Sequence, residues 1–309
     1  MYVGFDIGGT TVKYGVLDEN GAILEKGSIK TEYEPDSFYA SLLAIVKDAQ
    51  TRFQIKGIGM SAPGIVQQDG LMLTAGAIRP LYGENFKEKL TALTGLPVTV
   101  ENDANAVAIA EKWIGNAIGM ENYLCLVLGT GVGGGIVING KVYRGAHGMA
   151  GEFGWMMIDK LPEKGDLEAV SINKRSAIVG GLIPLYNEAQ KQRQKNVSQI
   201  SDAREIFALA EEGDALAIEI TKQFYVDLSV GLVNLISCFD PEAILIGGGV
   251  SANKTFHREL QKTLVEVETR HASINYLRGK TIAPVIPAKL ENDAGLIGAV
   301  YQIHQAVTK

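Results

Sequence analysis

Cysteine is scarce in this sequence, and long apolar runs are missing. Only Cys125 and Cys238 occur among the 309 residues, and both stand in apolar surroundings, which predicts buried free thiols. A secreted fold held together by disulfides is therefore excluded. No run of about 18 apolar residues occurs, so no transmembrane helix is expected. The first residues lack the charged and apolar regions of a signal peptide, and we expect a cytoplasmic protein.

Basic residues are in the minority. Lys and Arg number 29 against 35 Asp and Glu, which gives a net charge of −6. The densest basic stretch, QKQRQK at 190–195, is expected to be a solvated surface segment. Because an acidic chain without a basic block binds nucleic acid poorly, we expect neither a nucleic-acid nor a membrane partner. The apolar content of 46% is that of a globular protein with one large or two medium domains.

Glycine, by contrast, is concentrated in two similar segments. FDIGGTTVKYGVLDENG covers 5–21, and YLCLVLGTGVGGGIVINGKV covers 123–142. Each reads as an apolar strand, a turn of small residues and a second apolar strand. Because glycine has no Cβ, the backbone N–H groups of such a turn stay accessible to a phosphate. Two turns of this kind predict a nucleotide held in a cleft between two similar halves.

The rest of the sequence alternates strand and helix patterns. Three strands are expected first, at 2–7, 12–17 and 22–30, and apolar residues at helical spacing follow over 36–53. A helix over 84–94 then leads to a strand at 97–101, and the pattern restarts after 115–122. Residues 201–238 are mostly helical, AILIGGGVS at 243–251 leads from a strand into a helix, and the chain closes on a helix. This order predicts an α/β fold with an internal duplication.

Six short motifs occur in the order that is typical of the ROK family, which comprises sugar kinases and related repressors. They are DIGGT at 6–10, SAPG at 61–64, ENDANA at 101–106, LGTGVGGG at 128–135, GMAGEFG at 148–154 and LIGGG at 245–249. The resemblance implies an actin-like ATPase (ribonuclease H-like) fold, with two similar α/β domains around a central cleft. We expect a small domain over 1–117, completed by a terminal helix at 296–309, and a large domain over 118–295.

The resemblance also implies which residues bind ATP and Mg²⁺. Asp6 would hold Mg²⁺ through water, while the two glycine turns would hold the phosphates. From the residues alone, each turn is equally consistent with a structural bend. Thr11 and Lys13 share one face of a strand, and a phosphate contact from Lys13 stays open. The predicted ATP-binding residues are Asp6, Gly8, Gly9, Thr10, Thr11, Lys13, Gly129, Thr130, Gly131, Gly133, Gly248 and Gly249.

Asp103 is the residue that the resemblance identifies as the catalytic base. Taken alone, an Asp at the start of a helix is better explained as an N-cap. A helix N-terminus would also keep the carboxylate ionised and ready to accept the proton of a sugar hydroxyl. The predicted sugar-binding residues are Ser61, Pro63, Gly64, Asn102, Asp103, Glu152, Trp155 and Glu168.

One position departs from the family pattern. Most bacterial members have a His directly after the GExG motif and a cluster of Cys nearby, which together bind zinc, whereas Trp155 stands here and the cluster is missing. No zinc site is expected. Segment 155–170 must then be held by packing, for which Trp155, Met156 and Met157 are the apolar material. Trp155 is either a core residue or an aromatic face for a sugar.

These observations predict ATP-dependent phosphorylation of a sugar hydroxyl, at the 6-hydroxyl of a hexose or β-glucoside. Segment 74–83 lacks the sequence that is typical of glucose-specific relatives, which together with Trp155 favours a β-glucoside. An N-acetylmannosamine kinase and a glucokinase are the alternatives. A non-catalytic sugar sensor is a further alternative, although Asp103 and both glycine turns are intact. We also expect a homodimer.

Overall fold

The computed structural model describes residues 1–193 and 198–308, and the chain divides into two compact units. Unit 1 comprises Met1–Glu121, Gly135–Gly151 and Lys289–Lys309, and unit 2 comprises Asn122–Gly134 and Glu152–Ala288. The strands are β1 (Tyr2–Ile7), β2 (Thr11–Leu17), β3 (Ile23–Lys30), β4 (Ile58–Ala62), β5 (Val98–Asn102), β6 (Tyr123–Leu128), β7 (Val132–Ile138), β8 (Lys141–Val142), β9 (Ala243–Gly248) and β10 (Val285–Pro287). The α-helices are α1 (Pro35–Arg52), α2 (Phe86–Thr94), α3 (Asp103–Ile114), α4 (Ile172–Ser176), α5 (Ile183–Arg193), α6 (Ala203–Glu211), α7 (Ala215–Phe239), α8 (Lys254–Thr269), α9 (Ala272–Leu277) and α10 (Ala294–Thr308).

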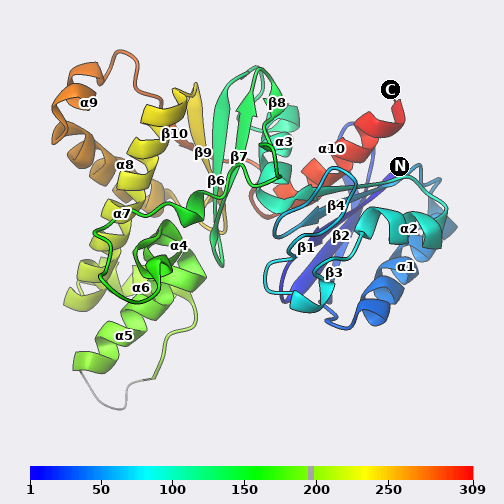
Figure 1. Cartoon of the computed structure of the whole chain (residues 1–309), viewed down its shortest axis with the longest axis horizontal. Coiled ribbons are helices and arrows are strands. Elements are labelled where there is room, and N and C mark those ends of the chain that lie inside the picture. Colours follow the sequence, from blue (N-terminus) through cyan, green and yellow to red (C-terminus); the bar gives the residue numbers. More distant parts are fainter. Residues whose placement is uncertain (194–197, 309) are drawn as a thin grey trace. The chain divides into compact units, whose positions relative to one another are not determined.

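The first sheet has the strand order β3-β2-β1-β4-β5. Strands β1, β2 and β3 are antiparallel neighbours, while β1, β4 and β5 run parallel. Side chains alternate between the two faces of a strand, so Val3 and Phe5 of β1 point into one core, together with Phe38 of α1 and Phe86 of α2. Figure 1 shows α1 and α2 together on one side of this sheet.

Helix α10 covers the other face of the first sheet, and glycine allows its close approach. A Cβ at Gly59 of β4 would clash with the carbonyl oxygen of Ala299, and a Cβ at Gly298 would clash with that of Ala106 in α3. The terminal helix therefore packs on the sheet formed by the first half of the chain, as the sequence predicts. Its last predicted residue, Lys309, lies outside the described residues.

The second sheet has the strand order β10-β9-β6-β7-β8. Strands β6, β9 and β10 run parallel, and β7 pairs with β8 in antiparallel fashion. Read in the opposite direction, this order matches the first sheet strand for strand, because β6 and β7 take the places of β1 and β2. The predicted internal duplication is confirmed.

The division into units differs from the predicted domains in three segments, because 118–121, 135–151 and 289–295 all belong to unit 1, although we expect them in the larger domain. Gly135 lies against α3, where a Cβ would come within 2.7 Å of the Ala108 Cβ. Beyond it, the Gly140 N–H donates to the Glu121 carbonyl at 2.8 Å, and the Arg144 guanidinium pairs with the Glu101 carboxylate. These contacts attach the β7–β8 turn and the following loop to unit 1.

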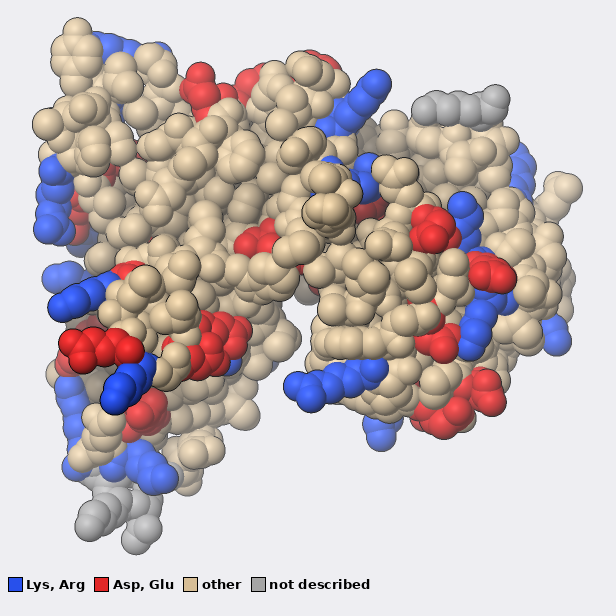
Figure 2. Space-filling view, in the orientation of Figure 1, with Lys and Arg blue, Asp and Glu red and all other residues tan. Residues whose placement is uncertain are grey.

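Surface features correct one expectation and agree with another. Cys125 is buried, but Cys238 is exposed near the C-terminal end of α7, so the prediction of two buried thiols is wrong for Cys238. On the face drawn in Figure 2, basic and acidic side chains are interspersed. Lys191 and Arg193 of the predicted basic segment are exposed at the end of α5, while 194–195 lie outside the described residues. Within 1–193 and 198–308, no helix is both long and apolar enough to cross a membrane.

Candidate active site

The N-terminal glycine turn is held through its carbonyl groups, which leaves N–H groups available. The Gly8 N–H donates to the Thr11 carbonyl at 3.0 Å, and the hydroxyls of Thr31 and Tyr33 donate to the carbonyls of Gly8 and Gly9, each at 2.7 Å. The N–H groups of Gly9 and Thr10 donate to no described residue. Two adjacent unengaged N–H groups in a tight turn form an anion-binding concavity.

The second glycine turn, in unit 2, repeats this arrangement. The Gly129 N–H donates to the Gly131 carbonyl at 3.0 Å. The π-helical segment Ile178–Leu182 supplies three further N–H donors, two to the Gly129 carbonyl at 3.1 Å and one to the Thr130 carbonyl at 3.0 Å. Within the part of the chain that the structure describes, the N–H groups of Thr130 and Gly131 donate to nothing. Both turns therefore present two N–H groups.

Gly133 is predicted to be part of this turn, but its place there is wrong. Gly133 lies inside β7, which begins at Val132, so its backbone belongs to the strand. The run of glycines continues into β7, where Gly135 in the middle of the strand approaches α3: a Cβ there would lie 2.9 Å from the Ala104 carbonyl oxygen. The turn itself consists of Gly129, Thr130 and Gly131.

Gly248 is the last residue of β9 and Gly249 follows it, and the two have different reasons for being glycine. Gly248 has a φ of +87°, and a Cβ there would clash with the Leu128 carbonyl oxygen at the end of β6. A Cβ at Gly249 would meet no atom within 4 Å. Gly248 thus makes the turn possible, whereas Gly249 leaves open space beside it for a ligand.

Asp6 stands at the end of β1 and is surrounded by partners. Its carboxylate accepts a hydrogen bond from the Ser61 hydroxyl at 3.1 Å and lies 3.5 Å from the Lys13 ammonium. Lys13 also donates to the Asn292 carbonyl at 3.2 Å, so its ammonium is already engaged. Ser61 is fully buried. We predict a sugar contact for Ser61, but burial at this place is unsuited to one, and its hydroxyl orients Asp6 instead.

Asn102, rather than Asp103, is the N-cap of α3. Its side-chain oxygen accepts from the N–H groups of Ala104 and Asn105 at 2.9 and 3.1 Å. Its amide group donates to the Gly64 carbonyl at 2.9 Å, and Gly64 has a φ of +96° that only glycine adopts readily. Asp103 is the first helical residue, and its carboxylate accepts from the Ala104 N–H at 2.8 Å. The alternative interpretation of Asp103 as the N-cap is therefore wrong.

Glu101 is an important residue that the sequence analysis misses. Its carboxylate is buried in unit 1 and pairs with Arg144, and it accepts from the amides of Gln302 at 3.0 Å and Asn105 at 3.1 Å. This network ties β5, α3 and α10 together directly beside Asn102. A carboxylate inside an apolar strand is the signal that could have identified it, since buried charges are paired.

The sugar-side residues of unit 2 occupy a short 3₁₀ turn and the loop after it. Glu152 precedes the turn Phe153–Trp155, and burial raises the pKa of its carboxyl group. Trp155 is 50% exposed, so it is not a core residue. Glu168 is exposed in the turn Leu167–Val170 and is available to a ligand.

Segment 155–170 is held by backbone pairing, and the expectation of side-chain packing is wrong for two residues. Met157, like Trp155, is about half exposed, at 52%. The Ile158 N–H donates to the Val170 carbonyl at 3.0 Å, and the Ile172 N–H donates to the Met156 carbonyl at the same distance. Backbone hydrogen bonds between the two ends of the segment thus hold it in place of the side-chain packing that we expect. Trp155 is left free to face a ligand.

Comparison with known proteins gives this arrangement a context. Residues 2–306 match the model of the ROK family. The chain belongs to the ROK family. It is 36% identical over 303 residues to a β-glucoside kinase from Listeria monocytogenes, covering 97% of this chain and 96% of that protein. It is 33% identical over 324 residues to a glucokinase from Halalkalibacterium halodurans, covering 98% and 95%.

The fold is shared with solved ROK structures. A ROK glucokinase from Streptomyces griseus, solved with glucose and AMPPNP, has a TM-score of 0.78 to this chain at 29% identity, covering 96% of this chain and 97% of that one. The predicted actin-like α/β fold is thereby confirmed.

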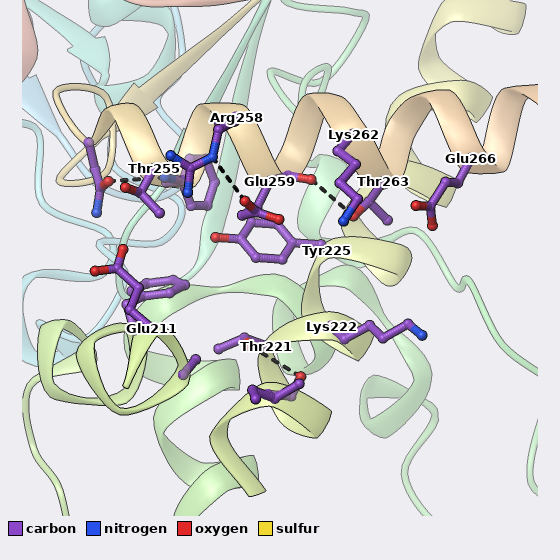
Figure 3. A pocket seen from close by; sticks show the side chains of 15 residues that line it. Glu211, Thr221, Lys222, Tyr225, Thr255, Arg258, Glu259, Lys262, Thr263 and Glu266 are labelled. Carbon is purple, nitrogen blue, oxygen red and sulfur yellow. Dashed lines mark hydrogen bonds and ion pairs between the residues drawn. The ribbon is translucent and has the colours of Figure 1, made fainter. Parts of the chain in front are cut away.

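A separate pocket of about 620 Å³ lies in unit 2 among α6, α7 and α8 (Figure 3). None of the predicted site residues of this ROK chain lines it. Three acidic and three basic side chains share its lining, so it favours neither sign of ligand charge: Glu211, Lys222, Arg258, Glu259, Lys262 and Glu266.

The first prediction concerns zinc. Within 1–193 and 198–308, no group of three or more His, Cys, Asp or Glu side chains is placed to bind a metal ion. We expect this ROK chain to contain less than stoichiometric zinc when purified, and a chelator to leave its melting temperature unchanged, because structural zinc needs four ligands. Elemental analysis and thermal unfolding with and without EDTA check this. One zinc per chain would contradict it.

Proposed function

We propose that this protein phosphorylates the primary 6-hydroxyl of a β-glucoside, with Asp103 as the base. The reaction class follows from the family and from relatives that match over nearly the whole chain: the protein is an ATP-dependent sugar kinase. The observation that supports it best is the repeated turn, in which Gly9 and Thr10 of unit 1 and Thr130 and Gly131 of unit 2 offer unengaged N–H groups. Nucleotide phosphates are the ligands that such turns suit.

The residues fit Mg²⁺ and ATP. Asp6 offers a partly exposed carboxylate that Ser61 orients, which suits a hard cation held through water. Bound there, Mg²⁺ would neutralise charge on the phosphates. Lys13 would balance Asp6 rather than contact phosphate directly, because its ammonium lies beside that carboxylate. Gly249, next to open space, would lie beside the nucleoside.

Asp103 would accept the proton of the sugar hydroxyl. Phosphoryl transfer passes through a loose transition state, so the enzyme mainly orients the hydroxyl and stabilises charge. The first turn of α3 favours the ionised carboxylate through its N–H groups. Asn102 and Gly64 hold the start of α3 in place. Glu152, Trp155 and Glu168 would also contribute to sugar binding.

The preference for a β-glucoside rests on Trp155. Because its side chain is half exposed, its aromatic face is available to an apolar group on the sugar. The kinase from Listeria monocytogenes at 36% identity is named for β-glucosides, which agrees with this preference. Free glucose, as in the Halalkalibacterium halodurans relative, and N-acetylmannosamine are the alternatives.

The second prediction tests that preference. Trp155→His should shift the ratio of kcat/KM from a β-glucoside toward free glucose by about 1–3 kcal/mol, the range for one pocket contact. Imidazole can hydrogen-bond an anomeric hydroxyl but offers less apolar area than indole. Tyr276→His is the control, since Tyr276 is an exposed aromatic residue of the same unit. An unchanged ranking in Trp155→His would remove the reason for choosing a β-glucoside.

The proposal as a whole is tested with a panel of sugars. ADP formation is followed in a coupled assay with free hexoses, N-acetylated hexoses and β-glucosides. We expect sugar-dependent ADP formation that is greatest with a β-glucoside. If sugars bind measurably but none of them supports ADP formation, the non-catalytic sensor is favoured.

A further inference from the structure

Helix α4 lies between the two parts of unit 2 to which we assign ligand binding. The loop that carries Glu168 ends where α4 begins, at Ile172. The π-helical segment Ile178–Leu182 follows shortly after α4 and donates to the carbonyls of the glycine turn. A side chain on α4 is therefore within reach of the turn at 129–131.

Asn173 makes that contact. Its side-chain oxygen accepts a hydrogen bond from the Val132 N–H at 2.7 Å. The same oxygen lies 3.2 Å from where a Cβ on Gly131 would be, and a Cβ on Gly154 would clash with it. The side chain thus fills a space that exists because both neighbours are glycine. It joins the glycine turn to the 3₁₀ turn that follows Glu152.

Helix α4 is itself held in place by an ion pair with α7. Two residues after Asn173, the Arg175 guanidinium donates to the Asp227 carboxylate of α7 at 2.8 Å. Asp227 is buried, and its other oxygen accepts from the Gln223 amide at 2.8 Å. Because this ion pair fixes α4 to α7, the position of Asn173 is set by the fold before any ligand binds.

We propose that Asn173 is a positioning residue that orients the turn at 129–132 for the phosphates of the nucleotide. Asn173 accepts a hydrogen bond from the N–H of the peptide group between Gly131 and Val132. This hydrogen bond fixes the plane of that peptide group. The preceding N–H groups, of Thr130 and Gly131, are those assigned to the phosphates. The inference rests on the proposed function for the identity of the ligand as a nucleotide.

Asn173→Ala removes the acceptor, and Asn187→Ala is the matched control. Asn187 lies on α5 in the same unit, and its side-chain oxygen also accepts a backbone N–H, that of Ile200, at 2.9 Å. The probe is AMPPNP with Mg²⁺, titrated calorimetrically into the full-length protein. We expect Asn173→Ala to raise the dissociation constant about tenfold or more. Asn187→Ala should leave it unchanged, although it removes two hydrogen bonds to the backbone of Ile200 where Asn173→Ala removes one to that of Val132.

Asn173→Asp separates positioning from mere stability. An Asp oxygen can still accept the Val132 N–H, so the melting temperature should return toward that of the wild type. Its negative charge beside the phosphates should nevertheless weaken AMPPNP binding, more at low than at high ionic strength because salt screens the repulsion. This variant also keeps the test decisive if Asn173→Ala does not fold.

Three outcomes would overturn the inference. They are equal weakening by Asn173→Ala and Asn187→Ala, wild-type affinity of Asn173→Asp at every salt concentration, and failure of the wild type to bind AMPPNP. A wild type that binds AMPPNP but phosphorylates no sugar contradicts the proposed function alone. In that case the binding comparison still decides the role of Asn173.

Discussion

Asp103→Asn should lower kcat by about 10²-fold or more, the usual consequence of removing a general base, while the protein stays folded. The amide cannot take the proton of the sugar hydroxyl, but its oxygen can still accept the Ala104 N–H that the carboxylate accepts at 2.8 Å. The N-cap of α3 is Asn102, which the substitution leaves in place. KM for both substrates and the melting temperature should therefore stay close to the wild-type values.

Asp36→Asn is the control for this experiment. Asp36 also stands in the first turn of a helix of unit 1, so the same change of charge occurs in the same kind of position. A general effect of losing a carboxylate at a helix N-terminus would appear in both variants. Steady-state kinetics with coupled detection of ADP compares them. A kcat for Asp103→Asn near that of Asp36→Asn would show that Asp103 is not the base.

Much of the fold follows from local sequence patterns. The predicted strands 2–7, 12–17 and 22–30 lie within a residue of β1, β2 and β3, because alternating apolar residues and the turn at 18–21 are local signals. The duplication was visible as two similar glycine segments. The length of the second turn could not be predicted in this way. Gly131 forms the turn and Gly135 lets a strand approach a helix, but the sequence shows a glycine in both cases.

Burial and hydrogen-bond partners were harder to predict from the sequence. Trp155, Met157 and Cys238 are apolar in type but exposed. Asn173 lies 41 residues from the N–H that it accepts, and nothing in the local sequence distinguishes it from a surface Asn. The order of motifs identifies residues that contact ligands, whereas residues that support them depend on tertiary contacts.

Glu111→Ala should produce the largest loss of stability among these variants, about 3–5 kcal/mol, the range for leaving buried partners of a charge unpaired. Glu111 lies in the last turn of α3 and has no exposed surface. One carboxylate oxygen accepts from the N–H groups of Lys289 and Leu290, both at 2.8 Å, and the other accepts from the Asn116 N–H at 2.7 Å. No other change suggested here removes three hydrogen bonds to one charged group.

The position of these three N–H groups explains why the loss should be large. The first stretch of unit 1 ends at Glu121, shortly after Asn116, and its last stretch begins at Lys289, so Glu111 holds both of these chain segments against α3. Urea denaturation measures the free energy of unfolding of Glu111→Ala, and Glu266→Ala, at an exposed position in α8, is the control for loss of a helical Glu. Glu111→Gln keeps one acceptor oxygen and should lose less, because that oxygen can serve Lys289 and Leu290 while the amide faces the Asn116 N–H. Equal stability of Glu111→Ala and Glu266→Ala would mean that water or neighbouring groups satisfy these N–H groups equally well, and that the carboxylate does not hold the two segments.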